Sequence, residues 1–207
     1  MIADVLKLVN GPIIPAPRTM DDFKIALGNF AFPSIILLFG DIGNLADLLA
    51  QARQHRKRLL VHFDLLEGIG KDRAGVKFVA QMGVTAIITT KSHLGKVARD
   101  EGMLVIQRIF LMDSEALRHG INTLRNFRPD AIEVLPASIP ASAVQQLTRE
   151  TGLPIFAGGL MYTSEDVKNA LKNGVYAVST SSRGLWREFA GEAKRSAAGV
   201  GFSSATE

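Results

Sequence analysis

The chain has 207 residues, of which 47% are hydrophobic and 21% are charged, enough for one well-packed domain. It contains no cysteine, which excludes disulfides, thiolate metal sites and cysteine nucleophiles and favours the cytosol. The formal net charge of +4 favours an anionic partner, either a phosphate compound or a nucleic acid.

Apolar runs alternate with helical patterns along the whole chain. The continuous apolar runs predict strands at 13–15, 34–38, 58–64, 86–89, 103–111, 130–135, 154–160 and 177–182. Helix-start signals between them predict helices that begin near Thr19, Asn44, Asp72, Ser92, Ser114, Ser142 and Ser164, with a last helix near Trp186.

Apolar strands that alternate with helices are typical of parallel strands covered by helices. Eight such units predict a compact α/β domain over residues 1–190, a closed (β/α)8 TIM barrel; the main alternative is an open doubly wound sheet. Residues 191–207 are expected to form a flexible C-terminal tail. We find no signal peptide, and the longest apolar run, 30–39, is too short to span a bilayer, so we expect a cytoplasmic protein without membrane contact.

The ends of the last two predicted strands carry residues suited to phosphate. The seventh strand ends in Gly158 and Gly159, and the eighth ends in Ser179, Thr180 and Ser181. In a barrel of this kind, the loops after strands 7 and 8 and the start of the final helix are the usual phosphate site. A glycine pair alone can serve only a tight turn, but the run of small hydroxyl residues one unit later favours a phosphate cradle.

Polar side chains also fall at the ends of the central strands. The two-residue period of a strand places His62 and Asp64 on one face and turns Glu133 toward the barrel interior. Glu133 could form an internal salt bridge with Arg108 or also contact ligand hydroxyls, and His62 could be a satisfied core histidine. Strand-end cations that could bind an anion are Lys91, Arg108 and, as a weaker candidate, Arg18.

One dense basic run, Arg53, Arg56, Lys57 and Arg58, lies between the second helix and the third strand. This position places it on the face opposite the predicted pocket. Such a run is usually a solvated helix end, and it is also the best candidate for a nucleic-acid contact.

Five ordered motifs carry a family resemblance. They are residues 62–68, 106–114, 132–136, 157–160 and 177–181, the last followed by Leu185 and Trp186. With these motifs the chain resembles the glycerol-3-phosphate-responsive antiterminator family over roughly residues 13–186. One departure is Ala137, where we expect glycine after Leu135 and Pro136, so the loop there should differ locally.

The resemblance implies a TIM-barrel regulator that binds glycerol 3-phosphate and then engages the leader of a glycerol-operon messenger RNA to prevent early termination. It implies that the effector phosphate sits on Gly158, Gly159, Ser179 and Thr180, with Ser181 beside them. Asp64 and Glu133 would accept hydrogen bonds from the glycerol hydroxyls, and His62, Lys91 and Arg108 would add donors. No cofactor is implied, and a homodimer is a further possibility.

The same pocket would also suit an enzyme that acts on a small polyol or sugar phosphate, an isomerase, epimerase or phosphodiesterase, with Glu133 or Asp64 as base and His62 as acid. Only the resemblance favours the regulator, for which no catalytic residue is expected. No metal-ligand spacing stands out, although Asp64, Glu67 and Glu133 would form a minority magnesium alternative.

Overall fold

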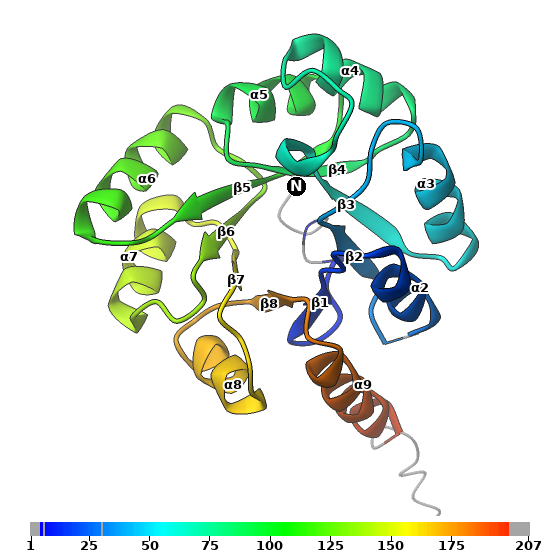
Figure 1. The fold of residues 1–207 in the computed structure, drawn as a ribbon. Helices are drawn as coiled ribbons and strands as arrows, with labels where there is room; N and C mark the ends of the chain where they lie inside the picture. Colours follow the sequence, from blue (N-terminus) through cyan, green and yellow to red (C-terminus); the bar gives the residue numbers. More distant parts are fainter. Residues whose placement is uncertain (1–4, 6, 30, 199–207) are drawn as a thin grey trace, which may run out of the picture.

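The computed structural model describes residues 5, 7–29 and 31–198, with side chains described up to residue 190. One parallel sheet of eight strands runs in the order β1-β8-β7-β6-β5-β4-β3-β2. Figure 1 shows the strands as a ring around a common axis, with the helices outside it. The strands are β1 (Ile13–Pro15), β2 (Ser34–Leu37), β3 (Arg58–His62), β4 (Ala86–Thr89), β5 (Leu104–Phe110), β6 (Ala131–Leu135), β7 (Ile155–Gly158) and β8 (Ala177–Thr180).

The helices alternate with these strands. They are α2 (Met20–Gly28), α3 (Leu45–Gln54), α4 (Arg73–Gln81), α5 (Ser92–Asp100), α6 (Ser114–Asn126), α7 (Ala141–Thr151), α8 (Ser164–Lys172) and α9 (Arg183–Ala198), with a 3-10 turn, η1 (Phe63–Leu65), after β3. Where β2 meets β1, the Leu38 amide donates to the Pro17 carbonyl at 3.3 Å and brings the two ends of the sheet together. The predicted (β/α)8 barrel is confirmed.

Local differences from the prediction lie at element ends. Helix α6 begins at Ser114 as predicted, but its cap is Asp113, whose carboxylate accepts from the Ala116 amide at 2.7 Å. Asn44 gives α3 no side-chain cap, because its amide oxygen accepts from the Asp41 amide instead. Helix α9 continues past residue 190 to Ala198, and the expected flexible end at 199–207 lies outside the described residues.

The barrel interior is apolar over most of its height. Its cluster includes Ile36, Leu60, Ile106 and Phe156, each at most 1% exposed, and a fully buried side chain of this size stabilises the fold by about 1.5–3 kcal/mol. Near the N-terminus, Val5 and Leu8 belong to the same cluster and so cover one end of the interior. The opposite end, where the strands finish, is polar. No helix in the described part of the chain is long and apolar enough to cross a membrane.

Candidate ligand-binding site

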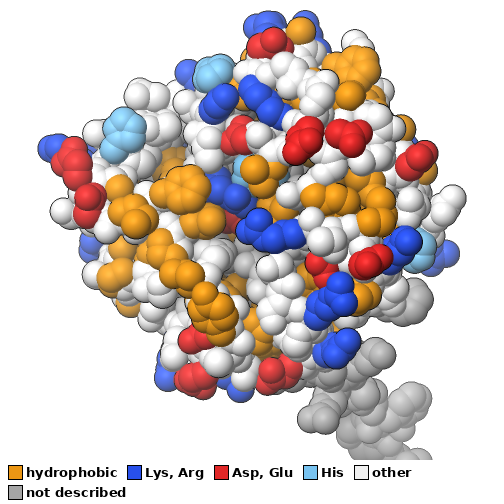
Figure 2. All heavy atoms as spheres, in the orientation of Figure 1, with side chains coloured by type: hydrophobic (Ala, Val, Ile, Leu, Met, Phe, Trp, Pro, Cys, Tyr) orange, Lys and Arg blue, Asp and Glu red, His pale blue; other side chains and the backbone are white. Residues whose placement is uncertain are grey.

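A cavity of about 250 Å³ opens at the carboxyl ends of β7, β8 and β1. Its wall is formed by the ends of several strands and their following loops: Ala16, Arg18, Leu38, Arg108, Leu135, Gly158, Gly159, Leu160, Met161, Tyr162, Ser179, Thr180 and Ser181. The five residues predicted to hold a phosphate therefore line one cavity, together with two arginines. In Figure 2, basic side chains gather near the middle of the face seen there, and hydrophobic side chains lie beside them.

Gly158 lets β7 and β8 approach closely. The two strands pair with Gly158 opposite Ser179, and a Cβ on Gly158 would lie 2.4 Å from Ser179 Oγ, which leaves no space for a side chain. The next residue, Gly159, has a φ of +78°, a backbone conformation that favours glycine. Its carbonyl accepts from the amide of buried Ala137 at 3.3 Å, so the loops after β6 and β7 are joined.

Glu133 lies below the cavity and holds two of its wall residues. The carboxylate is 1% exposed; Oε2 accepts from Arg108 Nε at 2.7 Å and Oε1 accepts from Ser179 Oγ at 2.7 Å. Such paired, hydrogen-bonded burial is what a carboxylate in an interior requires. The internal salt bridge considered for Glu133 is therefore present, and Glu133 itself is not part of the cavity wall.

The start of α9 lies beside the same wall. Trp186 Nε1 donates to the Thr180 carbonyl at 2.8 Å, and Ser182 N donates to Thr180 Oγ1 at 3.1 Å. The hydroxyl of Ser182 accepts from the Leu185 amide at 3.4 Å, as a helix cap does. The positive end of this helix thus adjoins Ser181, and it favours a bound anion.

Asp64 lies on η1, outside the cavity wall, and its oxygens already have partners. Oδ1 accepts from Thr89 Oγ1 at 2.7 Å, and Oδ2 accepts from the amide and hydroxyl of Thr90 at 2.7 and 2.8 Å. Burial alone would raise the pKa of Asp64, but the hydrogen bonds from Thr90 and Thr89 outweigh it and leave the pKa below its ordinary value. Asp64 thus anchors the end of β4 as a carboxylate.

His62 faces the barrel interior at the end of β3. It is 3% exposed, and neither ring nitrogen has a hydrogen-bond partner among the described residues. Burial, followed by the positive charge of Arg108, lowers the pKa of His62 to about 4, so the ring is neutral at pH 7. His62 therefore cannot carry the positive charge of a general acid in this structure.

Two lysines lie on the Asp64 side of the barrel mouth. Lys91 is exposed at the start of α5 and is not part of the cavity wall. Lys71, which was not among the predicted site residues, donates from Nζ to the carbonyls of Phe63 (2.7 Å) and Leu66 and interacts electrostatically with Asp64. Its position in the loop after the third strand is the only feature of the sequence that could have indicated it.

The basic run lies at the other end of the barrel, as predicted. Arg53, Arg56 and Arg58 are exposed, but Lys57 is only 7% exposed and donates from Nζ to the carbonyls of Asn29 and Phe32. The inclusion of Lys57 among exposed nucleic-acid contacts is therefore wrong, because its ammonium group is occupied by the protein backbone. Among the described residues, no group of three or more His, Asp or Glu side chains could hold a metal ion.

The fold and the cavity define a class: a (β/α)8 barrel with a small polar cavity at the ends of its last two strands. Residues 13–186 match the model of one protein family, the glycerol-3-phosphate responsive antiterminators. A protein of Escherichia coli K12, the uncharacterized protein YgcP, is 31% identical over 180 residues, which are 86% of this chain and 93% of that protein.

Solved structures agree with this family. The glycerol uptake operon antiterminator regulatory protein of Listeria monocytogenes is 33% identical with a TM-score of 0.82, over 88% of this chain and 98% of that one. A glycerol uptake operon antiterminator-related protein of Thermotoga maritima is 32% identical with a TM-score of 0.77, over 86% and 99%. An N-acetylmannosamine-6-phosphate 2-epimerase of Clostridium perfringens, 14% identical with a TM-score of 0.63 over 85% and 88%, shares the fold. The chain belongs to the glycerol-3-phosphate responsive antiterminator family.

Proposed function

We propose that this protein is a transcription antiterminator whose effector, glycerol 3-phosphate, binds in the cavity between the ends of β7, β8 and β1. The observation that carries the proposal is the convergence of Gly158, Gly159 and the 179–181 segment with Arg108 on one small polar cavity. Exposed backbone and hydroxyl donors beside a helix start suit a phosphate dianion, and the arginine adds positive charge.

Arg108 is the principal cation of the proposed site. Its side chain is 11% exposed, and Glu133 holds Nε, while Nη1 and Nη2 donate to no group in the described part of the chain. The guanidinium is therefore fixed in direction with two nitrogens available to a ligand. Because Glu133 fixes both Arg108 and Ser179, we assign it a positioning role and not a direct contact with the glycerol hydroxyls.

The hydroxyl end of the effector has three predicted partners outside the cavity wall. Asp64, His62 and Lys91 stay predicted partners, although none of them lines the cavity. For Asp64, the three hydrogen bonds from Thr89 and Thr90 favour a structural role. Substitution of Asp64 separates the two roles, because only a direct contact would change effector affinity in a variant that stays folded.

The partner of the effector-bound form is the leader messenger RNA of a glycerol operon. The description of the family supports this assignment, and the excess of basic residues is consistent with an RNA partner. A gel-shift titration of the leader RNA with and without glycerol 3-phosphate tests the proposal. A large increase in RNA affinity with the effector supports it, and equal affinities in both series would defeat it.

Catalysis is the alternative function, since distant neighbours with this fold include enzymes. Two observations oppose catalysis. Both oxygens of Glu133 accept hydrogen bonds, from Arg108 and Ser179. The pKa of Asp64 lies below its ordinary value, which makes Asp64 a weak base. Incubation with glycerol 3-phosphate, its diesters and sugar phosphates, followed by phosphorus NMR, distinguishes the alternatives. Steady turnover would favour the enzyme.

Homodimerisation stays a prediction. Four large side chains near the cavity are 52–79% exposed: Phe110, Met112, Leu160 and Tyr162. Leu160 and Tyr162 line the cavity, and Phe110 and Met112 lie at and just after the end of β5; exposed apolar side chains are typical of surfaces that a protein partner covers. Light scattering after size-exclusion chromatography, with and without glycerol 3-phosphate, would measure the oligomeric state directly.

A further inference from the structure

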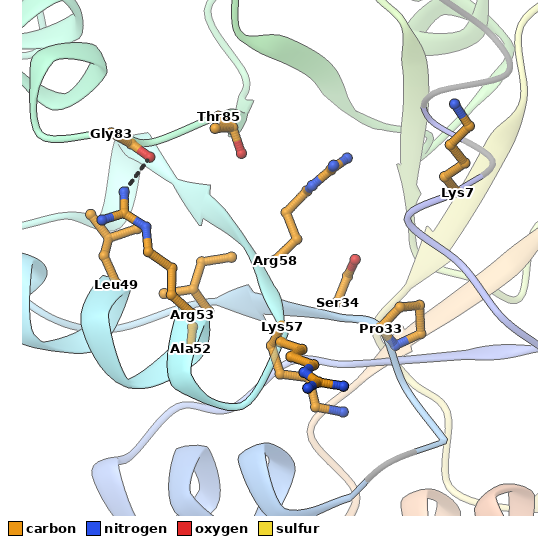
Figure 3. Close-up of a pocket in the computed structure, with 12 residues that line it drawn as sticks. Lys7, Pro33, Ser34, Leu49, Ala52, Arg53, Lys57, Arg58, Gly83 and Thr85 are labelled. Carbon is orange, nitrogen blue, oxygen red and sulfur yellow. Dashed lines mark hydrogen bonds between the residues drawn. The ribbon is translucent and has the colours of Figure 1, made fainter.

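A second hollow, of about 380 Å³, lies at the amino-terminal ends of β2, β3 and β4. Its wall includes Lys7, Ser34, Arg53, Arg56, Arg58 and Thr85. Figure 3 labels all of these except Arg56 and shows them around the hollow. Ser34 and Arg58 are the first residues of their strands and pair across the sheet. The hollow is therefore at the opposite end of the barrel from the effector cavity.

Among the described residues, the charge of this hollow has one sign: its wall contains five Lys and Arg residues and no described Asp or Glu. Arg58 shares a strand face with Leu60 and His62, both in the barrel interior, and its guanidinium extends between Ser34 and Thr85 in Figure 3. An exposed arginine in a concave wall whose described residues include no carboxylate is suited to a phosphate group.

Ser34 gives a second, independent indication of a ligand. Its side chain is 1% exposed, and Oγ has no hydrogen-bond partner among the described residues although the residue lines the hollow. Buried hydroxyls are nearly always paired, because burial without a partner is unfavourable. A phosphate oxygen beside Arg58 would satisfy this donor.

The loop that presents Arg56 is fixed by the protein. Arg56 has a φ of +55°, which is unusual for a residue with a side chain, and its amide donates to the Arg53 carbonyl at 2.9 Å. The Lys57 amide donates to the Ala52 carbonyl at 2.8 Å, and the buried Lys57 ammonium holds the backbone on the other side. Arg53 Nη2 is in turn fixed on the Gly83 carbonyl at 3.1 Å. The Arg53 side chain and the backbone that presents Arg56 are thus held in place before a ligand arrives.

We propose that this hollow binds the phosphodiester backbone of the leader RNA. The proposal rests on the RNA-binding function above and assigns its contact surface. None of the described wall residues is aromatic, so they offer no ring on which a base could stack, and we expect contacts to phosphates that do not depend on base identity. Sequence recognition must then come from another part of the surface.

The test compares the double variant Arg56→Ala/Arg58→Ala with the control Arg149→Ala/Lys168→Ala. The control removes the same charge from two exposed residues on α7 and α8, away from both hollows. RNA affinity is measured for the leader transcript and for a uridine oligomer over a range of salt concentrations. We expect the affinity of the first variant for both RNAs to fall about 10-fold or more. The slope of log K against log salt should become shallower by about 1.4, because each lost contact to a single-strand phosphate changes it by about 0.7. The control should match the wild type.

A Ser34→Ala variant gives a second measurement. Since Ser34 Oγ donates to no described protein group, its removal should leave the melting temperature unchanged and weaken binding of both RNAs a few-fold. Calorimetry with glycerol 3-phosphate accompanies every variant, and effector affinity should stay at the wild-type value.

The outcomes are separable. If the wild type binds leader RNA and the Arg56/Arg58 variant binds it equally well with an unchanged salt slope, the surface assignment is wrong and the antiterminator function stands. If the wild type binds no leader RNA with or without effector, both proposals are wrong. If both double variants lose RNA affinity equally, the RNA responds to the overall charge of the protein, and the assignment of this hollow is also wrong.

Discussion

Gly158→Ala tests the central feature of the effector site, the close approach of β7 and β8. The new methyl group would lie 2.4 Å from Ser179 Oγ and 3.5 Å from Glu133 Oε1. Ser179 must move, and its 2.7 Å hydrogen bond to Glu133 is then lost. Overpacking costs about 1–3 kcal/mol, and loss of a bond to a buried carboxylate costs about 1.5–3 kcal/mol, so the free energy of unfolding should fall by about 3 kcal/mol or more.

Urea unfolding measures that fall, and calorimetry with glycerol 3-phosphate measures binding. Because the methyl group and the displaced Ser179 would enter the cavity wall, effector affinity should drop at least about 10-fold, equivalent to about 1.4 kcal/mol. Gly184→Ala is the matched control. Its methyl group would meet only Ser182 Oγ at 3.7 Å, an ordinary contact, and alanine suits a helix better than glycine, so neither quantity should fall.

The double variant Gly158→Ala/Ser179→Ala tests whether the new methyl group acts through its contact with Ser179 Oγ. Removal of Ser179 Oγ takes away the atom that the new methyl group would strike, so Gly158→Ala should cost less in the Ser179→Ala background than alone. For residues in contact we expect a coupling energy of about 1–3 kcal/mol. Wild-type stability and affinity in Gly158→Ala, or strictly additive effects in the double variant, would refute the packing argument.

Further predictions concern buried polar groups. The pKa of His62 is about 4, and its ordinary value is 6.5, so between these pH values the unfolded chain binds a proton that the folded chain does not. The free energy of unfolding should therefore rise with pH across that window, by about 3 kcal/mol in total. In His62→Leu, the free energy of unfolding should depend less on pH over the same range. Glu133→Gln should lower the free energy of unfolding by about 3 kcal/mol, since Arg108 loses its charged partner, and circular dichroism melting checks this. Asp64→Ala should lower the free energy of unfolding by about 1–3 kcal/mol and leave effector affinity unchanged. Weaker effector binding by a variant that stays folded would instead indicate that Asp64 contacts the effector directly. Lys57→Met should be destabilising by a similar amount and leave RNA affinity unchanged.

The sequence was most informative where a rule of the fold places distant residues together. The order of strand and helix patterns predicts the barrel, and the barrel then brings the ends of the last two strands side by side. Gly158 and Ser179 are 21 positions apart in sequence, yet they are paired neighbours in the sheet. Since this juxtaposition follows from topology, it could be predicted without knowledge of any side-chain position.

Side-chain partners were less predictable, because they depend on where elements end. Extension of the strand alternation from His62 to Asp64 placed both in the pocket, but β3 ends at His62 and η1 turns Asp64 toward Thr89 and Thr90. Likewise, nothing in a basic run marks Lys57 as the buried member. Its carbonyl partners lie 25 and 28 positions earlier in the chain, and a local pattern carries no information about them.

The two proposed sites lie at opposite ends of one barrel, and this restricts how they can communicate. Strand β3 carries Arg58 at its start and His62 at its end, with Leu60 fully buried between them. A tightly packed interior does not deform continuously, so an effector can strengthen RNA binding only if it binds one of two discrete arrangements better than the other. Linkage then requires reciprocity: the factor by which glycerol 3-phosphate raises RNA affinity must equal the factor by which RNA raises effector affinity. Calorimetry in both orders measures the two factors, and a factor of one in both orders would show that effector binding and RNA binding are not coupled.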